Sequence, residues 1–280
     1  TIVYRESWVR EAGFSGIPKD FPGYLELSRA LKRIGRPSGL ALGNAVGDAG
    51  WTDWVLWGFG SSLIDENSKV AIDNPRTLEA LDYGKALYET FIPGTLSWLD
   101  PSNNKAFLAG EISMTTNGIS IYYAAKTSED PTLKAMAADI QHGVYPVGPV
   151  GHATQGATVI NAMIMAYTKY PNAAKEFLRF MMEEEQYVPW QEASIGYWNH
   201  PLAAYDANPI WASDPKITAY KDVMRLALPA SYKGRPSEAA SAAKADFVVV
   251  NMFQSVCAGQ QSPKDAMAEA ARRARRFFGA

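Results

Sequence analysis

The sequence predicts an α/β fold, because segments typical of strands alternate with segments typical of helices along most of the chain. The stretch 112–116 has the short apolar character of a strand. By contrast, Asn74-Pro75 and Pro171 each open a segment whose apolar residues recur at helical spacing. The length of 280 residues suffices for one large domain or two ordinary ones.

In the first half of the chain, residues 1–4 are expected to end a strand and residues 7–12 to form a short helix. A second helix is predicted over 24–34, where the apolar residues share one face. A third helix is predicted to begin at Pro75 and to stop before a Pro-Gly pair, and 112–116 is predicted to be a strand.

In the second half, the apolar run 159–167 indicates a buried strand, and Pro171 is expected to start a helix with its apolar face toward the core. The stretch 237–258 contains three consecutive valines, which favour a strand. It is too long without Gly or Pro for one ordinary strand, so we predict a single helix. Ser262, followed by Pro263 and Asp265, is typical of a capped start for the last helix.

The composition is that of a normal globular protein, with 47% hydrophobic and 20% charged residues. A net charge of −2 argues against nucleic acid or an anionic membrane surface as a partner. One cysteine, Cys257, precludes an intramolecular disulfide bond. No apolar run reaches membrane-spanning length and no signal peptide is visible, so we expect a processed or truncated start at Thr1.

Catalytic signatures are nearly absent from the chain. It has no His-Glu-x-x-His motif, no Walker A loop and no Gly-x-Ser-x-Gly motif, and its three histidines lack metal-ligand spacing. Two Ser-x-x-Lys matches, at 102–105 and 241–244, lack the companion motifs of the enzymes that use them. The sequence therefore predicts a non-enzyme with no cofactor and no metal site.

Aromatic residues are abundant, with 8 Trp, 14 Tyr and 11 Phe. Trp51, Trp54 and Trp57 would form one helical stripe, which is typical of core packing. Trp51 follows Asp48-Ala49-Gly50, so we expect it at the mouth of its element and partly exposed. An exposed ring there could stack on the apolar face of a sugar, whose hydroxyls need planar polar partners. The predicted ligand-binding residues are Trp51, Asn117, Gln155, Tyr197, Trp198 and Arg235.

Several segments, taken in their order along the chain, carry a resemblance to a known family. They are Tyr4 to Phe14, Phe107-Leu108-Ala109-Gly110-Glu111-Ile112-Ser113-Met114, Thr116-Asn117-Gly118 and Gly234-Arg235-Pro236. Together they resemble the extracellular solute-binding proteins of ABC importers, family 1, the carbohydrate type. In that family the segment similar to Tyr4–Phe14 lies well inside the chain. The resemblance therefore implies that the N-terminal portion is missing from this sequence.

The resemblance implies a two-lobe periplasmic-binding-protein-like fold of type II, with the first lobe incomplete in this chain. One lobe, of the C-terminal type, would comprise 1–147 and 208–280. The remaining part of the N-terminal-type lobe would comprise 148–207. The Gly- and Pro-rich stretch 144–157 would be the crossing between them.

The implied function is capture of a sugar, sugar alcohol or short oligosaccharide by closure of two lobes, with delivery to the membrane permease subunits of an ABC importer. The implied location is periplasmic or extracellular, with a lipid anchor as one mode of attachment. Two alternatives remain open: a carbohydrate hydrolase with aromatic platforms and paired carboxylates, and a capture protein for a glycerol phosphate or a peptide.

Overall fold

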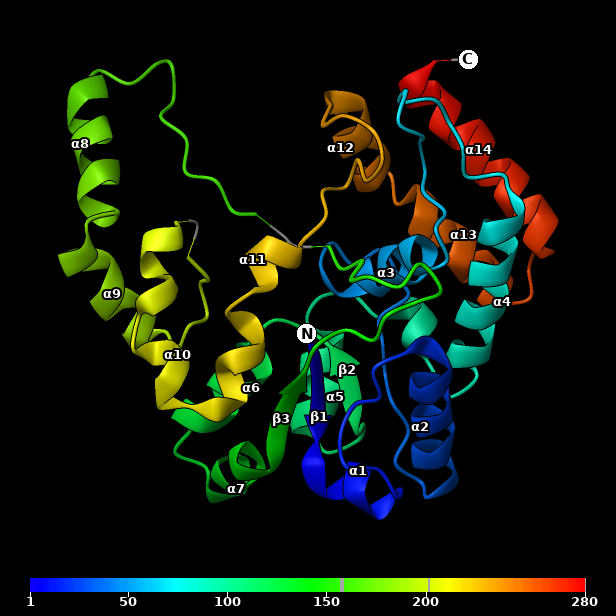
Figure 1. Ribbon diagram of the computed structural model, residues 1–280, viewed down its shortest axis with the longest axis horizontal. Helices are drawn as coiled ribbons and strands as arrows, with labels where there is room; N and C mark the ends of the chain where they lie inside the picture. The colour runs from blue at the N-terminus through cyan, green and yellow to red at the C-terminus, as the bar shows by residue number, and fades with distance from the viewer. Residues whose placement is uncertain (157–158, 201, 280) are drawn as a thin grey trace.

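The computed structural model describes residues 1–156, 159–200 and 202–279 (Figure 1). A three-stranded antiparallel sheet lies near the centre, in the order β2-β1-β3. Its strands are β1 (Ile2–Arg5), β2 (Met114–Thr116) and β3 (Ile140–Gly143). Val3 lies opposite Thr115 on one side and His142 on the other. The strands predicted at 1–4 and 112–116 therefore pair as neighbours.

Helices surround this sheet. In the first half they are α1 (Glu6–Glu11), α2 (Phe21–Arg33), α3 (Trp51–Gly58), α4 (Pro75–Tyr88), α5 (Ser102–Leu108), α6 (Ser120–Thr127) and α7 (Pro131–Asp139). In the second half they are α8 (Pro171–Met181), α9 (Glu184–Ala193), α10 (Ile210–Ser213), α11 (Val223–Leu226), α12 (Glu238–Ala245), α13 (Val248–Cys257) and α14 (Pro263–Phe278). Within the described ranges, no helix is long and apolar enough to cross a membrane.

Several predicted helix starts are confirmed together with their caps. Asn74 accepts hydrogen bonds from the backbone N–H groups of Arg76 and Thr77 at the start of α4. Ser262 accepts one from the N–H group of Asp265 at the start of α14. These bonds satisfy donors that the first turn of a helix leaves without partners.

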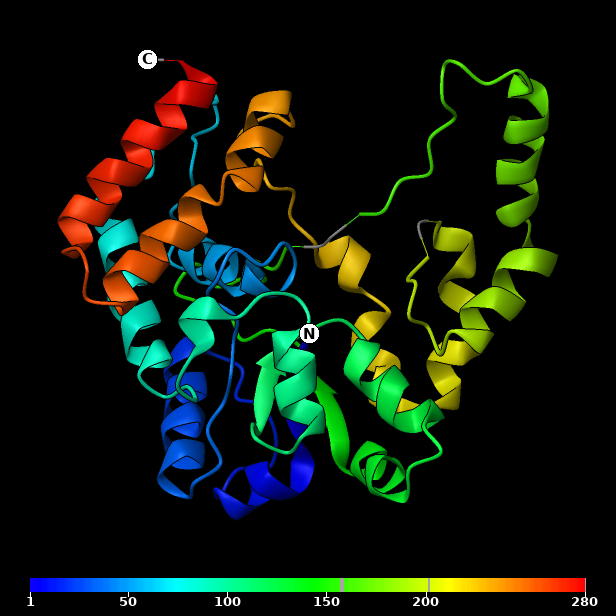
Figure 2. The same cartoon turned by 180° about the vertical axis from the view of Figure 1, so that it is seen from behind.

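The larger hydrophobic cluster lies among α2, α3, α4, α13 and α14, which are grouped on the left in Figure 2. Trp54 on α3 is buried there against Phe21 and Tyr24, and its indole N–H donates to the carbonyl of Pro146 at 2.9 Å. Cys257 is partly buried against this cluster, and burial raises the pKa of its thiol to about 12. A free cysteine in such surroundings packs as a small apolar residue.

A second cluster covers the sheet on the side of α6, α7 and α10, with Phe107, Ile121, Ile140, Trp211 and Ile217 among its members. The described residues of 148–207 contribute little to either cluster: only the partly buried Ile195 packs against the second one. The division into 1–147 with 208–280 and 148–207 stays a prediction.

The predicted buried strand at 159–167 is wrong. The structure has no strand over these residues, and most of their side chains are exposed, with Met163 at 78%. A strand needs a neighbour to pair its N–H and C=O groups. The described part of the chain supplies no neighbouring strand along this segment.

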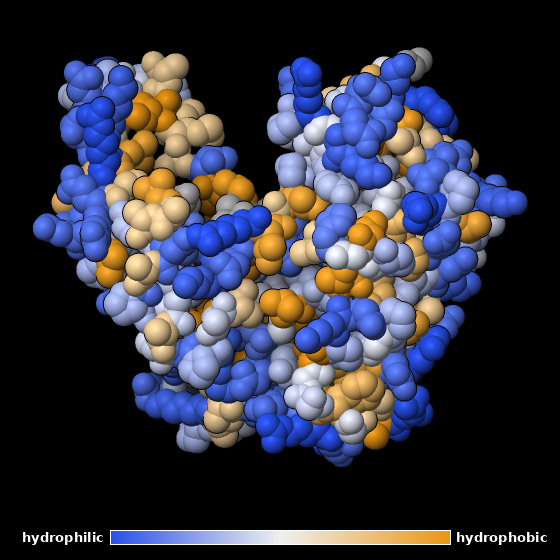
Figure 3. Space-filling view, viewed as in Figure 1, coloured by the Kyte–Doolittle hydropathy of each residue, from blue (hydrophilic) through white to orange (hydrophobic). Residues whose placement is uncertain are grey.

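The helix predicted from Pro171 forms as α8, but its apolar face is not covered, since Phe177 is 60% exposed. In Figure 1, α8 stands apart from the sheet and joins the rest of the molecule through α9. Figure 3 shows a hollow between this arm and the rest of the molecule, with apolar residues along the inner side of the arm. The local helical signal was correct, whereas the expected burial was wrong.

The single helix predicted over 237–258 is also wrong, because the chain breaks between α12 and α13. Phe247 adopts a left-handed backbone with φ of 54°. Arg273 on α14 holds the preceding residue, with 2.7 Å between its Nη2 and Oδ2 of Asp246, and its Nη1 donates to Oδ1 of Asn251 at 2.9 Å. A contact from a distant helix thus stabilises a break that no Gly or Pro signals.

Candidate functional site

Asn117 lies where the chain leaves β2, at one corner of a network of amide groups. Its Oδ1 accepts hydrogen bonds from the backbone N–H of Gly118 at 2.6 Å and from the hydroxyl of Ser120 at 3.2 Å. Its Nδ2 donates to Oδ1 of Asn104 on α5. The neighbouring Asn103 is buried and donates to the carbonyl of Thr116 at 3.2 Å. The start of α5 and the end of β2 therefore position two amide side chains side by side.

Two carboxylates adjoin this network. Asp100 accepts hydrogen bonds from the backbone N–H groups of Val46 at 2.9 Å and Asp48 at 3.2 Å, which holds the loop 44–50 in place. Burial raises the pKa of the Asp48 carboxyl to about 7, with smaller contributions from its side-chain interaction with Asp100 and from the charge of Asp100. A hydrogen bond from Asn103 opposes this shift. We call Asp48, Asp100, Asn103, Asn104 and Asn117 the carboxylate–amide cluster.

The carboxylate–amide cluster combines acceptors and donors within a few residues of the sheet. Carboxylates accept hydrogen bonds and amides both donate and accept, which is the chemistry that hydroxyl groups need. The sequence predicted only Asn117 of these five residues. The clustering of Asp100-Pro101-Ser102-Asn103-Asn104 was the available signal, since such turn-forming residues lie on loops that carry function.

The structure corrects the expectation for Trp51. Its side chain is 0% exposed, its indole N–H donates to the carbonyl of Ala41 at 2.7 Å, and its ring lies edge-on to Phe91 and Phe253. The residues before it, Asp48–Gly50, form a helical turn that continues directly into α3. Trp51 therefore begins the buried stripe of α3 with Trp54 and Trp57, and a ring in this position cannot stack on a ligand.

Tyr197 and Trp198 are 40% and 37% exposed, and their ring centroids lie 5.4 Å apart. Trp190 on α9 lies nearly parallel to Trp198, with 6.3 Å between the ring centroids and 13° between the planes. Tyr123 on α6 meets Tyr197 edge-on at 5.7 Å. We call these four residues the aromatic ledge.

The other two predicted residues lie elsewhere. Gln155 is buried, and its backbone carbonyl accepts a hydrogen bond from the N–H of Leu228 at 2.8 Å. Arg235 is exposed, and its backbone N–H donates to the hydroxyl of Ser68 at 3.3 Å. Among the described contacts of the six predicted residues, only the rings of Tyr197 and Trp198 meet one another. That Arg235 and Asn117 face one cleft stays a prediction.

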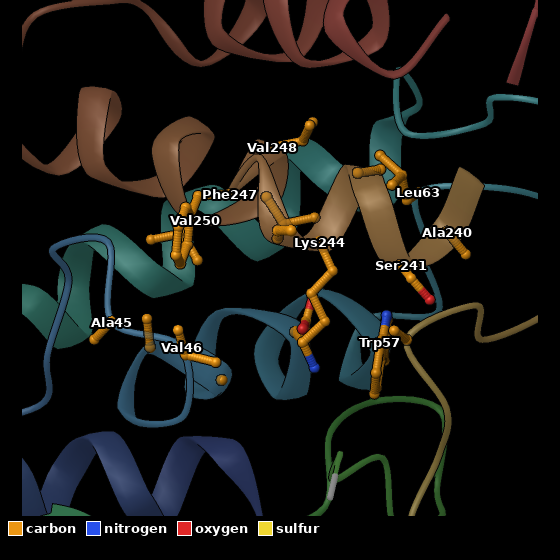
Figure 4. A pocket seen from close by; sticks show the side chains of 17 residues that line it. Ala45, Val46, Trp57, Leu63, Ala240, Ser241, Lys244, Phe247, Val248 and Val250 are labelled. Atoms are coloured by element: carbon orange, nitrogen blue, oxygen red, sulfur yellow. The ribbon is translucent and has the colours of Figure 1, made fainter. Parts of the chain in front are cut away.

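A cavity of about 420 Å³ opens beside the loop 44–50, between α3, α12 and α13 (Figure 4). Its lining is largely apolar and includes Val46, Trp57, Leu63, Phe247, Val248 and Val250. Asp53, Ser241 and Lys244 supply its polar groups. Burial raises the pKa of Asp53, and the positive charge of Lys244 opposes this shift. No group of three His, Cys, Asp or Glu side chains within the described ranges could hold a metal ion.

A family model described as bacterial extracellular solute-binding protein matches residues 1–219. The chain belongs to this family. A probable ABC transporter-binding protein of Deinococcus radiodurans is 21% identical over 189 residues, which is 64% of this chain and 44% of that protein. The chain thus spans less than half the length of this curated relative. The family resemblance inferred from Tyr4–Phe14 and the later motifs is confirmed.

Solved structures of similar fold carry different ligands. The maltose-bound MalE3 of T. maritima superposes with a TM-score of 0.77 at 19% identity, over 98% of this chain and 69% of that one. A sugar transporter from Arthrobacter chlorophenolicus A6 with bound laminaribiose gives 0.76 at 19% identity, over 98% and 68%. An ABC transporter solute-binding protein from Agrobacterium radiobacter K84 in complex with ribitol gives 0.69 at 20% identity, over 99% and 69%. The prediction of a type II periplasmic-binding-protein-like fold is confirmed.

Proposed function

We propose that the protein is the substrate-binding component of an ABC importer and captures a sugar, a sugar alcohol or a short oligosaccharide. The carboxylate–amide cluster is the observation that carries this proposal. Asp100 and Asn104 present planar acceptors and donors close to the end of the sheet. Neutral polyhydroxy ligands are recognised by a few such groups placed in a concave site.

The aromatic ledge supports the same ligand class. A sugar ring has an apolar C–H face, and the exposed faces of Trp198 and Tyr197 could stack against it. Capture would proceed by closure of two lobes around the ligand about a hinge. In this proposal Arg235 and Gln155 belong to the binding site, as the sequence predicts, and the ligand is released unchanged.

The proposed partners are the membrane permease subunits of the importer, to which the closed protein delivers its ligand. Membership of an extracellular solute-binding family supports a periplasmic or extracellular location. A lipid anchor is the proposed mode of attachment to the membrane. The proposal involves no cofactor and no covalent step.

The Asp48–Asp100 pair is the feature that favours the alternative of a carbohydrate hydrolase, because a carboxyl group with a pKa of about 7 can act as a general acid. Retaining and inverting glycosidases, however, hold their two carboxyl groups roughly 5–9.5 Å apart to admit the sugar or a water. In this chain Asp100 instead accepts a hydrogen bond from the backbone N–H of Asp48 at 3.2 Å, which leaves no room between them for a sugar. This arrangement favours capture over hydrolysis.

The deciding experiment measures thermal stability of the chain against sugars, sugar alcohols, oligosaccharides, a glycerol phosphate and peptides, since a ligand stabilises the folded state by mass action. Ligands that raise the melting midpoint are then titrated by calorimetry and recovered for chromatography.

We expect recovery of intact ligand, and Asp100→Asn should weaken binding roughly 10- to 100-fold through one lost charged hydrogen-bond acceptor. Glu129→Gln, an exposed carboxylate between α6 and α7, is the control. Hydrolysed product, or stabilisation by phosphates or peptides alone, would overturn the proposal.

A further inference from the structure

The cavity beside α12 has an uneven distribution of polar groups. Figure 4 shows the hydroxyl of Ser241 and the amine of Lys244 both extending from α12 toward α3. Asp53 on α3 is the third polar group in the lining, and it interacts electrostatically with Lys244. The remaining lining is aliphatic or aromatic, with exposed Val46 among it. The cavity therefore has one polar edge and an otherwise apolar surface.

This polar edge suits a neutral group that bears oxygen. Asp53 accepts hydrogen bonds, Lys244 donates them, and the hydroxyl of Ser241 does both. Because the lining carries one acidic and one basic side chain, neither an anion nor a cation is favoured by charge alone. A hydroxyl or ether oxygen matches this set, and the apolar surface matches a ring or an alkyl chain.

The same loop contributes to the cavity and to the carboxylate–amide cluster. Ala45, Val46, Ala49 and Gly50 line the cavity, whereas the backbone N–H groups of Val46 and Asp48 bind Asp100 of the cluster. The loop 44–50 therefore borders both the cavity and the carboxylate–amide cluster. The volume of about 420 Å³ falls in the range of about 300–1,000 Å³ that is usual for small-molecule sites.

We propose that the cavity between α3, α12 and α13 binds the apolar aglycone of a glycoside whose sugar is held by the carboxylate–amide cluster. This inference rests on the proposed capture of a carbohydrate and narrows it to sugars that carry an aryl or alkyl substituent. An oxygen atom on the substituent would lie at the polar edge formed by Asp53, Ser241 and Lys244.

The test compares pairs of probes that share a sugar and differ in the substituent. Methyl and 4-nitrophenyl glycosides of glucose, galactose, mannose, xylose and maltose are titrated into the chain by calorimetry. We expect at least one sugar for which the nitrophenyl glycoside binds about tenfold or more tightly than the methyl glycoside, because a buried aromatic ring leaves water. Equal affinity within every pair that binds would overturn the inference.

A substitution at Gly50 tests whether the higher affinity of the nitrophenyl glycosides arises in this cavity. It has a helical backbone with φ of −63°, and no atom lies within 4 Å of the position that a Cβ would take. Gly50→Leu should therefore fold and occupy part of the cavity, which abolishes the affinity gain of the nitrophenyl glycoside over the methyl glycoside. Gly47→Leu is the matched control, because Gly47 also has free space but does not line the cavity. A gain that survives in Gly50→Leu would overturn the assignment.

A sugar-free probe separates this inference from the proposed function. 2-Phenylethanol combines an aromatic ring with one hydroxyl and can enter the cavity without a sugar. Saturable binding that Gly50→Leu removes, with no glycoside bound, would overturn carbohydrate capture and retain the cavity as an apolar site. Absence of saturable binding by both 2-phenylethanol and the nitrophenyl glycosides would overturn the cavity site, whatever the methyl glycosides do.

Discussion

Arg273 on α14 reaches Asp246 at the end of α12, with 2.7 Å between Nη2 and Oδ2, and it also binds Asn251 on α13. One guanidinium group thus joins three helices at the point where Phe247 turns the chain through a left-handed conformation. The same helices α12 and α13 form the cavity. The shape of that cavity therefore depends on a residue outside its lining.

Replacing Arg273 with alanine should lower the free energy of unfolding by about 1–3 kcal/mol, because Asp246 and Asn251 lose charge-assisted hydrogen bonds. Urea denaturation monitored by circular dichroism measures the effect. The adjacent Arg272→Ala is the control, since Arg272 pairs with Glu269 on the exposed face of α14. Equal effects of the two substitutions would mean that Arg273 does not hold the helix break.

Trp51→Ala should lower the free energy of unfolding by about 3–5 kcal/mol, because it empties a fully buried site between Phe91 and Phe253. Denaturant melts measure this loss. Trp198→Ala, at an exposed ring, should leave the melting midpoint nearly unchanged and weaken sugar binding by about 1–3 kcal/mol. A stable Trp51→Ala variant with weakened binding would restore Trp51 as a ligand platform.

Asp48 should make stability fall as the pH rises from about 4 to about 7. The pKa of its carboxyl is about 7 in the folded chain, against an ordinary value of 3.8, so the folded state binds the proton more tightly. The stabilisation is complete below pH 4 and is lost through pH 7, and we expect on the order of 2 kcal/mol after allowance for partial exposure. Asp48→Asn should remove this dependence in urea melts across that range. An unchanged pH profile in the variant would contradict the assignment.

His142 on β3 should produce the opposite trend. Burial lowers the pKa of its imidazole to about 4, so the unfolded state binds the proton more tightly below about pH 6.5. Stability from this group is present above pH 6.5 and is lost as the pH falls toward 4. His142→Gln should flatten this part of the profile, and NMR titration of the ring should give a midpoint near 4. A midpoint near 6.5 would contradict the buried neutral ring.

The fold was predictable wherever local signals and tertiary packing agree. Asn74 and Ser262 cap helices that also bury an apolar face, so a reading of local sequence was sufficient. It failed at 159–167 and over α8, where apolar residues predicted burial that the described residues do not provide. It failed again at Phe247, because the contact from Arg273 spans 27 positions and leaves no local pattern.

The candidate site was less predictable than the fold. Asn117 was predicted because it follows a strand, but Asp48 and Asp100 are far apart in sequence and meet only through the folding of the loop 44–50. Trp51 was misplaced because the three residues before it have the composition of a loop, yet they form a helical turn. Packing decides which of several aromatic residues remains exposed, and composition contains no information about packing.

The loop 44–50 lies between two proposed binding regions and has side chains or backbone groups in each. If an occupant of the cavity shifts Val46 or Asp48, the hydrogen bonds from their backbone N–H groups to Asp100 change as well. The two regions would then be energetically coupled, and the coupling must be equal in both directions. Binding of one part of such a compound would then raise or lower the affinity of the protein for the other part.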